Sequence, residues 1–279
     1  MTPSFPGIHV VPVRTPTLPP ATHTNTWLLG QGQITVVDPA SPWEDEQARL
    51  FDALWSRIEA GERVERLFLT HHHHDHVSGA MDLQARLADV GQRVPIAAHP
   101  VTAELVRGTV SVEAHVDHGD VLDCGGRTFV AHFTPGHAPG HLALHDPDSG
   151  AIIAGDLVAG VGTIAIDPRE GDLQDYLDSL EAMRALEPQA LMPAHGPVLE
   201  HPDAVLSFYV AHRHGRSEQI RTALHELGEA SPLELAPAVY PELPAEHHPL
   251  AAAQILTHLH WLRRNQLVAE KSEGRWVIR

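Results

Sequence analysis

Five histidines and one aspartate in six consecutive positions, residues 71–76, constrain this chain more than any other feature. The run before them, residues 64–69, is short and apolar, which predicts a buried strand. Apolar residues at helical spacing follow from Val77 onward. We therefore expect the cluster to lie on a strand-to-helix turn, where a rigid strand end holds several side chains around one point. Imidazole and carboxylate groups are ligands for zinc, manganese and iron.

Three further segments place histidine or aspartate beside glycine or proline. They are Thr134-Pro135-Gly136-His137, Gly155-Asp156 and Pro193-Ala194-His195-Gly196-Pro197. Together with His71-x-His73-x-Asp75-His76, they resemble the four motifs of the metallo-β-lactamase superfamily, in the same order. Four motifs in series are a specific match, whereas one alone would be weak. An expression tag does not explain the histidine run, because tags lie at termini and contain no aspartate.

The resemblance implies a centre with two divalent metal ions per chain, expected to be zinc, with manganese or iron as alternatives. The implied ligands are His71, His73 and His137 for the first metal, Asp75, His76 and His195 for the second, and Asp156 as the bridge. A water shared by ions roughly 3.5–4 Å apart would ionise near neutral pH and act as the nucleophile. Asp75 would orient this hydroxide, so that Asp75 and Asp156 are the expected catalytic residues.

The resemblance also implies the fold class, an α/β (α+β) four-layer αββα sandwich of two mixed sheets with the metals at one edge. Alternating strand and helix signals place this catalytic domain in residues 1–202. The predicted strands are 8–13, 26–29, 34–37, 64–69, 94–98, 121–124, 128–133, 142–145, 151–154 and a short one ending near His195. The predicted helices are 44–60, one from Val77, 102–106 and 172–186.

Residues 203–279 are predicted to form a small, mainly helical domain that resembles a winged helix. One helix has Leu227 on its apolar face, and a second opens at Ser231-Pro232 and is interrupted at Pro237. A third has an apolar face over residues 252–262, and residues 267–278 predict a terminal hairpin.

Several polar residues near the motifs have two interpretations each. Asp38 follows a predicted strand and either supports the histidine motif or ends a turn. His72 and His74 occupy the variable motif positions, where we expect them to point outward or to support a ligand rather than bind metal directly. His141 is either such a supporting or substrate-facing residue or a polar loop residue.

Three residues of the predicted helices are weaker candidates for substrate contact. Arg213 and Arg216 either bind an anionic tail of the substrate or are ordinary exposed arginines. Tyr176 either contacts substrate or is packed in the core. Cys124, the single cysteine, is expected to be a buried and inert thiol, and it excludes an intrachain disulfide.

The formal net charge of −17 disfavours unassisted binding to DNA or RNA. Residues 1–6 lack the basic and apolar regions of a signal peptide, and no apolar run reaches the length of a membrane span. We therefore expect a cytoplasmic protein that acts on a small molecule and not at a membrane.

The motifs define a mechanism more closely than a substrate. The leading prediction is hydrolysis of an acyl thioester or ester, as in hydroxyacylglutathione hydrolases. The second is metal-dependent cleavage of single-stranded RNA, because residues 212–220 and the helical tail resemble a branch of the superfamily that carries a winged helix and includes an endoribonuclease and thioesterases. A persulfide dioxygenase with one iron is a further alternative, which the full set of seven ligands disfavours.

Overall fold

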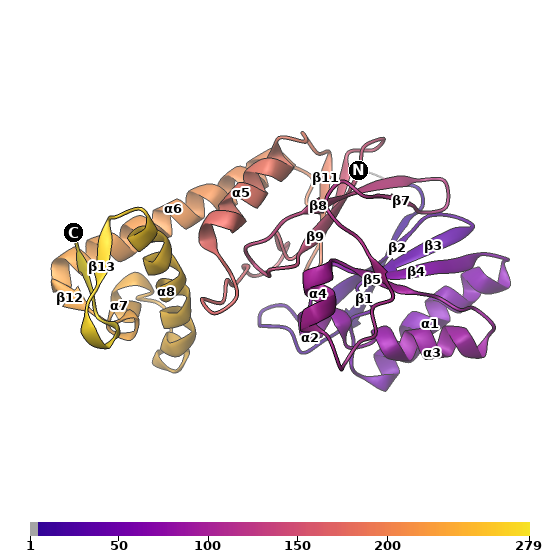
Figure 1. The fold of residues 1–279 in the computed structure, drawn as a ribbon, viewed down its shortest axis with the longest axis horizontal. Coiled ribbons are helices and arrows are strands. Elements are labelled where there is room, and N and C mark those ends of the chain that lie inside the picture. Colours follow the sequence, from indigo (N-terminus) through magenta and orange to yellow (C-terminus); the bar gives the residue numbers. More distant parts are fainter. Residues whose placement is uncertain (1–4) are drawn as a thin grey trace.

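The computed structural model describes residues 5–279, apart from the side chain of Glu273, and is built around two β-sheets (Figure 1). The first has the strand order β1-β2-β3-β4-β5-β6 and the second β11-β10-β9-β8-β7. The first sheet comprises β1 (Ile8–Arg14), β2 (His23–Leu29), β3 (Gln33–Val37), β4 (Arg63–Leu69), β5 (Ile96–Ala98) and β6 (Ala114–His115). The second comprises β7 (Val121–Asp123), β8 (Thr128–Phe133), β9 (Leu142–Asp146), β10 (Ala151–Gly155) and β11 (Ala190–Pro193).

Both sheets are mixed, and the connections explain why. Strands β1, β2 and β3 are antiparallel, with a tight turn between β2 and β3 at Gly30-Gln31-Gly32. Strands β3 to β6 are parallel, which requires crossovers. These crossovers contain α1 (Glu44–Glu59), the short α2 (His74–Val77), α3 (Ala80–Asp89) and α4 (Pro100–Leu105). In the second sheet, β7 to β10 are antiparallel and only β10 and β11 are parallel, through α5 (Leu173–Arg184).

Three apolar layers separate four layers of secondary structure. Leu50 and Leu54 of α1 pack on Ile34 and Leu67 of the first sheet. Between the two sheets, Trp27 and Phe68 meet Phe129, Leu144 and Ile153. On the outer face of the second sheet, residues of α5 and α6 (Pro202–Leu227) cover β10 and β11. The structure thus confirms the predicted αββα sandwich.

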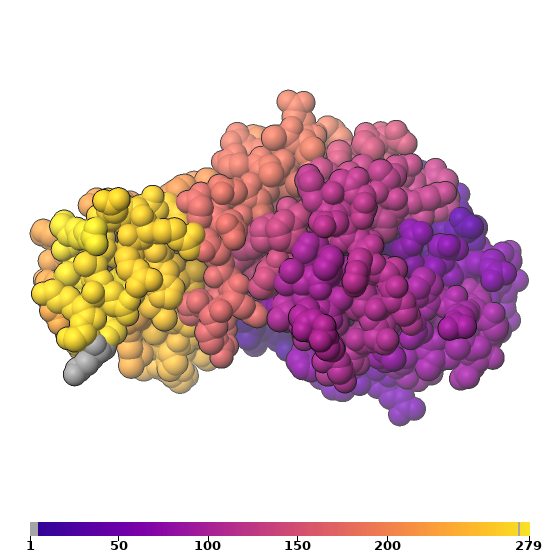
Figure 2. All heavy atoms as spheres, in the orientation of Figure 1, coloured from indigo at the N-terminus to yellow at the C-terminus, as the bar shows by residue number. Residues whose placement is uncertain are grey.

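A separate apolar core lies in the C-terminal part of the chain. Helix α6 leads into β12 (Glu229–Ala230), α7 (Pro232–Val239), α8 (His248–Arg264), β13 (Val268–Glu270) and β14 (Trp276–Ile278). The three strands form a sheet of order β12-β14-β13, and the fully buried Trp276 packs with Ile255 and Leu259 of α8. This order of helices and strands confirms the predicted winged helix. The unit forms a lobe beside the larger body (Figure 2).

Three local predictions were wrong, and two short strands were missed. The helix predicted from Val77 breaks after that residue, because Gly79 packs so closely on Pro39 and Ser41 that a Cβ there would lie 2.6 Å and 2.8 Å from their carbonyl oxygens. Helix α7 continues past Pro237 to Val239, since Leu235, Ala236 and Val239 are buried in the C-terminal core. Leu227, predicted to be buried, is 52% exposed at the end of α6. The short strands β6 and β12 were not predicted, because two residues carry no periodic signal.

Other predictions have more limited support. Cys124 is buried, as expected. In the part of the chain that the structure describes, no helix is long and apolar enough to cross a membrane. The division at residues 202 and 203 stays a prediction, and it falls at the first residue of α6, which begins at Pro202. The interpretation of residues 1–6 falls mainly on residues 1–4, which lie outside the described residues.

Trp276→Ala should destabilise the C-terminal unit by about 3–5 kcal/mol, because it empties the centre of that core. Thermal and denaturant unfolding followed by circular dichroism would measure this. Phe208→Ala removes an aromatic ring that is 65% exposed on α6 and should change the free energy of unfolding by less than about 0.5 kcal/mol. Equal effects of both changes would contradict the assignment of this core.

Candidate metal centre

The seven predicted ligands meet at one edge of the sandwich, beyond the carboxyl ends of four strands. His71, His73, Asp75 and His76 follow β4, and His137 follows β8. Asp156 directly follows β10, and His195 lies two residues after β11. Strand ends that feed loops are rigid points from which side chains can converge. Residues up to 124 positions apart in the sequence (71 to 195) therefore come together here.

One group consists of three imidazole nitrogens. The Nδ1 atom of His73 lies 3.0 Å from Nε2 of His71 and 3.0 Å from Nε2 of His137. His71 and His137 are buried, and His73 is partly exposed. Burial lowers the pKa of His71 well below its ordinary value and that of His137 to about 4, so both rings are neutral and each can offer a lone pair to a metal.

A second group contains Asp75, His76 and His195. The Nε2 atom of His195 lies 3.5 Å from Oδ2 of Asp75, and Nε2 of His76 lies 4.0 Å from Oδ1 of the same carboxylate. Asp156 lies between the two groups. Its Oδ1 is 3.6 Å from Nε2 of His76 and 3.4 Å from Nε2 of His195, while its Oδ2 is 3.4 Å from Nε2 of His137. One carboxylate thus faces both groups, one oxygen toward each.

The donor atoms fit a pair of cations. Nε2 of His76 and Oδ1 of Asp156 are buried and have no hydrogen-bond partner in the described structure. An unpaired buried polar atom is costly, and a bound metal ion would satisfy both. Burial lowers the pKa of His76, but the carboxylates of Asp156 and Asp38 outweigh it and hold that pKa well above its ordinary value. This part of the site therefore stabilises positive charge.

Each of the five histidines among the predicted ligands has a hydrogen-bond acceptor on the ring nitrogen that faces away from the site. The other ring nitrogen is therefore free to bind a metal. The five contacts are His71 Nδ1 with Thr70 Oγ1 (3.0 Å), His73 Nε2 with Glu170 Oε1 (2.9 Å), His76 Nδ1 with Asp38 Oδ2 (2.8 Å), His137 Nδ1 with the carbonyl of Ala165 (2.7 Å) and His195 Nδ1 with the carbonyl of His23 (2.9 Å). The surroundings thus select the tautomer that binds metal in every ring.

Asp38 supports the histidine motif, one of its two predicted roles. Its buried carboxylate accepts hydrogen bonds from the Thr70 backbone (2.8 Å), the Thr70 hydroxyl (2.7 Å) and Nδ1 of His76 (2.8 Å). The residue has a φ of 51°, a left-handed conformation that aspartate and asparagine tolerate better than most residues. Asp38 thereby ties the end of β3 to the motif that follows β4.

His141 is a buried supporting residue rather than a polar loop residue. Its Nδ1 donates to the Thr134 hydroxyl (2.7 Å), and its Nε2 accepts from the backbone N–H of Asp156 (3.1 Å). Burial lowers the pKa of His141 to about 3, which keeps Nε2 free to accept. A Cβ on Gly155, whose φ is 50°, would lie 2.5 Å from this nitrogen. His141 therefore positions Asp156 from behind and requires glycine at 155.

His72 and His74 do not face the two ligand groups directly. His74 is exposed, and Nε2 of His72 lies 3.0 Å from Glu170. His72, His73 and Glu170 lie close enough to hold an ion, but the carboxylate pairs directly with both rings. Those hydrogen bonds hold the pKa of Glu170 well below its usual range. No sequence signal singled out Glu170, which lies 97 positions from His73 in an irregular segment.

Arg213 and Arg216 are not ordinary exposed helix arginines, so that alternative was wrong, while contact of either side chain with an anionic substrate stays a prediction. Arg213 is buried, donates to the carbonyl of Ile164 and lies 5.1 Å from the ring centroid of Tyr176. Arg216 donates to the carbonyl of Val239 and lies over the ring of Tyr240. Tyr176 is packed, with its hydroxyl donating to the carbonyl of Leu157 (2.8 Å). All three side chains therefore hold structural elements together.

Comparison with known families agrees with this architecture. Residues 19–195 match the family model described as metallo-beta-lactamase superfamily. Residues 231–276 match the one described as beta-lactamase associated winged helix domain. The chain therefore belongs to the metallo-β-lactamase superfamily, whose members are typically hydrolases, and carries the winged helix associated with it.

Individual relatives are similar over most of the chain. A beta-lactamase-like protein 2 homolog of Drosophila melanogaster is 29% identical over 251 residues, which cover 86% of this chain and 82% of that protein. The crystal structure of a beta-lactamase domain protein from Burkholderia ambifaria has a TM-score of 0.85 at 23% identity and covers 99% of this chain and 94% of that one. The crystal structure of TTHA1623 in a di-iron-bound form has a TM-score of 0.55 at 26% identity. The similarity covers 70% of this chain and 96% of that one.

Asp38→Asn should weaken metal binding by about 10- to 100-fold, because an amide places a donor where the carboxylate accepts three hydrogen bonds. It should also destabilise the fold by about 1–3 kcal/mol, while asparagine still tolerates the backbone conformation. Metal affinity would be measured by competition with a chromophoric chelator. Asp89→Asn, at an exposed position on α3, is the control. Wild-type affinity in the Asp38 variant would show that Asp38 does not support the site.

Proposed function

We propose that this protein is a hydrolase that uses two divalent metal ions to cleave an acyl thioester or ester of a small molecule. The proposed ligands are His71, His73 and His137 for one metal, Asp75, His76 and His195 for the other, and Asp156 for both. Convergence of these donors in two groups, with the carboxylate of Asp156 between them, supports the dinuclear centre.

The charge balance of the site carries the preference for an acyl substrate. Asp75 and Asp156 among the ligands, and Asp38 and Glu170 directly behind them, supply four negative charges. Two divalent ions supply four positive charges, so the loaded centre is neutral before its water ionises. In residues 5–279, no lysine or arginine forms an ion pair or hydrogen bond with any of the seven ligands. A neutral acyl carbonyl suits such a site better than a phosphodiester anion, which would lack a cationic partner from the chain.

When bound, two metal ions would provide a water that ionises near neutral pH, and they would polarise the scissile oxygen. The chain supplies orientation. Asp75, next to His195 and partly exposed, is placed to orient the attacking water. Asp156 fixes the two groups of donors relative to each other, and His141 holds its backbone. Asp38, Thr70 and Glu170 keep three of the imidazoles in the tautomer that binds metal.

The metal and the location of the protein stay predictions. Imidazole and carboxylate donors suit zinc, manganese and iron. The similarity to TTHA1623, whose structure is described as di-iron-bound, supports testing iron beside zinc. We expect a cytoplasmic protein, in agreement with a single cysteine that is buried.

Cleavage of single-stranded RNA is the second candidate, favoured by the winged helix. The charges of that unit oppose RNA binding, because all lysine and arginine side chains of residues 203–279 except Arg279 are engaged within the protein. Arg221, Arg263, Lys271 and Arg275 pair with acidic residues of the same unit, Arg264 pairs with Asp172, and Arg213 and Arg216 donate to backbone carbonyls. Nucleic-acid affinity depends on basic groups that are available to phosphates.

His73→Ala should lower thioesterase activity on the order of 10³-fold, because metal charge contributes several kcal/mol to such reactions. S-lactoylglutathione and an acyl-CoA are suitable first substrates, and metal content would be measured by mass spectrometry. A chelator should remove the activity, and zinc, manganese or iron should restore it. His74→Ala, in the same motif but exposed, should retain activity and two metals per chain. A single iron with no hydrolysis would contradict the proposal and favour a persulfide dioxygenase.

Single-stranded RNA should bind more weakly than about 100 μM at physiological salt, because the basic groups of the C-terminal unit are already paired. Fluorescence anisotropy with a labelled oligonucleotide would measure this. Glu229→Gln combined with Glu234→Gln removes both ion pairs of Arg275 and should tighten any nonspecific binding. Micromolar binding by the unchanged protein, with RNA cleavage that is lost in His73→Ala, would instead favour the endoribonuclease.

A further inference from the structure

The irregular segment between β10 and α5 contacts the candidate metal centre at two points. The carbonyl of Ala165 accepts from Nδ1 of His137 (2.7 Å), and the carboxylate of Glu170 accepts from Nε2 of His73 (2.9 Å). Two of the three rings of one ligand group thus depend on this segment for their orientation. The same carboxylate also meets Nε2 of His72 (3.0 Å).

Helix α8 of the winged helix forms hydrogen bonds with the same segment. The backbone N–H of Ile166 donates to Gln254 Oε1 (3.1 Å), and its carbonyl accepts from Gln254 Nε2 (3.2 Å) and from the Thr257 hydroxyl (2.8 Å). The carboxamide of Gln254 thus pairs with both the N–H and the carbonyl of Ile166, as the backbone of a neighbouring β-strand would. Ile166 is the neighbour of Ala165, so the helix and His137 contact adjacent residues of the segment.

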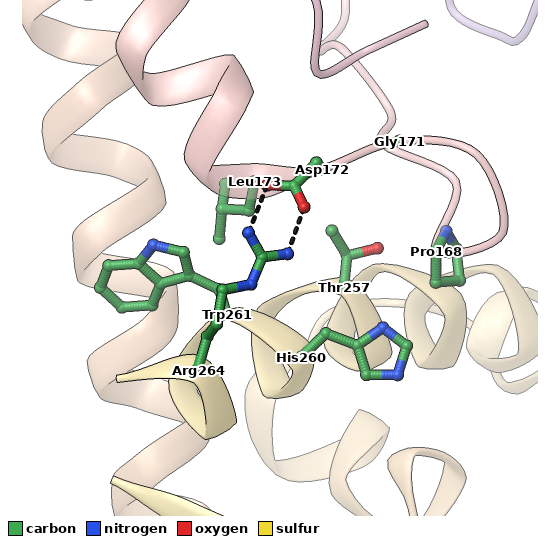
Figure 3. A pocket seen from close by; sticks show the side chains of 8 residues that line it. All are labelled: Pro168, Gly171, Asp172, Leu173, Thr257, His260, Trp261 and Arg264. Carbon is green, nitrogen blue, oxygen red and sulfur yellow. Dashed lines mark hydrogen bonds and ion pairs between the residues drawn. The ribbon is translucent and has the colours of Figure 1, made fainter. Parts of the chain in front are cut away.

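A second contact lies where the segment enters α5. Arg264 of α8 forms a two-point ion pair with Asp172, the residue that caps α5, two positions after Glu170 (Figure 3). Close by, Nε1 of Trp261 donates to Gln174 (2.9 Å). Arg264 reaches from α8 to Asp172, and Thr257 points from the same helix toward the segment (Figure 3). Glu170 therefore lies between Ile166 and Asp172, which are both held by the winged helix.

We propose that Glu170 is a positioning residue for the metal centre and that α8, through Gln254, Thr257 and Arg264, holds the segment that places it. The inference rests on the metal centre of the proposed function but not on its substrate. In a helix-turn-helix unit, the second helix of the motif is the one that lies in the major groove of DNA. Here that helix is α8, and its polar side chains bind the catalytic domain of the same chain. The winged helix thus serves the metal centre within the molecule.

The physical reason is the preference of a histidine ligand for a hydrogen-bonded second nitrogen. An acceptor on Nε2 keeps the proton there, leaves Nδ1 free for the metal and makes the ring a better donor. The side chain of Glu170 is 32% exposed, so packing alone does not hold it. Apart from its hydrogen bonds with His72 and His73, its position depends on the backbone on either side, which α8 contacts at Ile166 and Asp172.

Glu170→Ala should weaken metal binding by about 10- to 100-fold, as loss of a carboxylate behind a metal-bound histidine does in other sites. Glu170→Gln should have a smaller effect, because its amide oxygen still accepts from His73. Affinity would be measured by competition with a chromophoric chelator. The tautomer of His73 would be measured in the metal-free protein by ¹H–¹⁵N NMR. Arg169→Ala, at the adjacent residue, which pairs with Asp167, is the matched control and should change neither quantity.

Arg264→Gln should weaken metal binding by up to about 5-fold, the amount expected for a largely exposed ion pair. Combined with Gln254→Ala and Thr257→Val, it should approach the effect of Glu170→Ala. Arg263→Gln, one position earlier on α8, breaks a pair with Glu270 inside the winged helix and should leave the affinity unchanged. In a Glu170→Ala background, the α8 changes should have no further effect on the His73 tautomer, since both act through Glu170.

Unchanged affinity and an unchanged His73 tautomer in a folded Glu170→Ala protein would overturn the proposal. Equal effects of the Arg263 and Arg264 variants would overturn the part assigned to α8. Circular dichroism would establish that each variant is folded. Failure of this inference can be distinguished from failure of the proposed function. A wild-type protein that binds two metals without cleaving thioesters still permits measurement of the metal affinity and of the His73 tautomer. The tautomer test requires no bound metal.

Discussion

The carboxylate of Asp156 lies between two groups of buried histidines, and much of the surrounding structure serves to hold it there. Buried carboxylates and unpaired ring nitrogens are costly unless a cation satisfies them. Oδ1 of Asp156 and Nε2 of His76 are such atoms. The fold carries this cost at one edge of the sandwich, where the surrounding acceptors favour positive charge. A pair of metal ions is the chemistry that relieves it.

The sandwich positions these donors through strand ends and close backbone contacts. Gly155 allows His141 to approach the backbone that carries Asp156, and Gly136 allows the turn before His137 to pack on α5. At Gly136, where φ is 120°, a Cβ would lie 2.2 Å from the backbone nitrogen of Tyr176. These glycines belong to the motifs because other residues would push the ligands out of place.

The winged helix gives the molecule a second level of organisation. Its own core is distinct from that of the sandwich, although Trp261 packs against both. Helix α6 contributes buried residues to both cores, and α8 binds the segment that carries Ala165 and Glu170. Ordinary surface ion pairs contribute little to stability. The contact between Arg264 and Asp172 is more informative as a geometric restraint, because it lies close to a residue that orients His73.

The sequence by itself determined the superfamily, the four layers, the winged helix and the seven residues that converge at the edge. Strand patterns and motif spacing are local properties of the chain, so they can be recognised in the sequence alone. Only the tertiary structure revealed Glu170 and the carbonyls of Ala165 and His23 as partners of the histidines. It also showed that Arg213 is buried and donates to the carbonyl of Ile164. Such contacts join residues far apart in the chain, and a backbone carbonyl has no sequence signature, so they follow from packing alone.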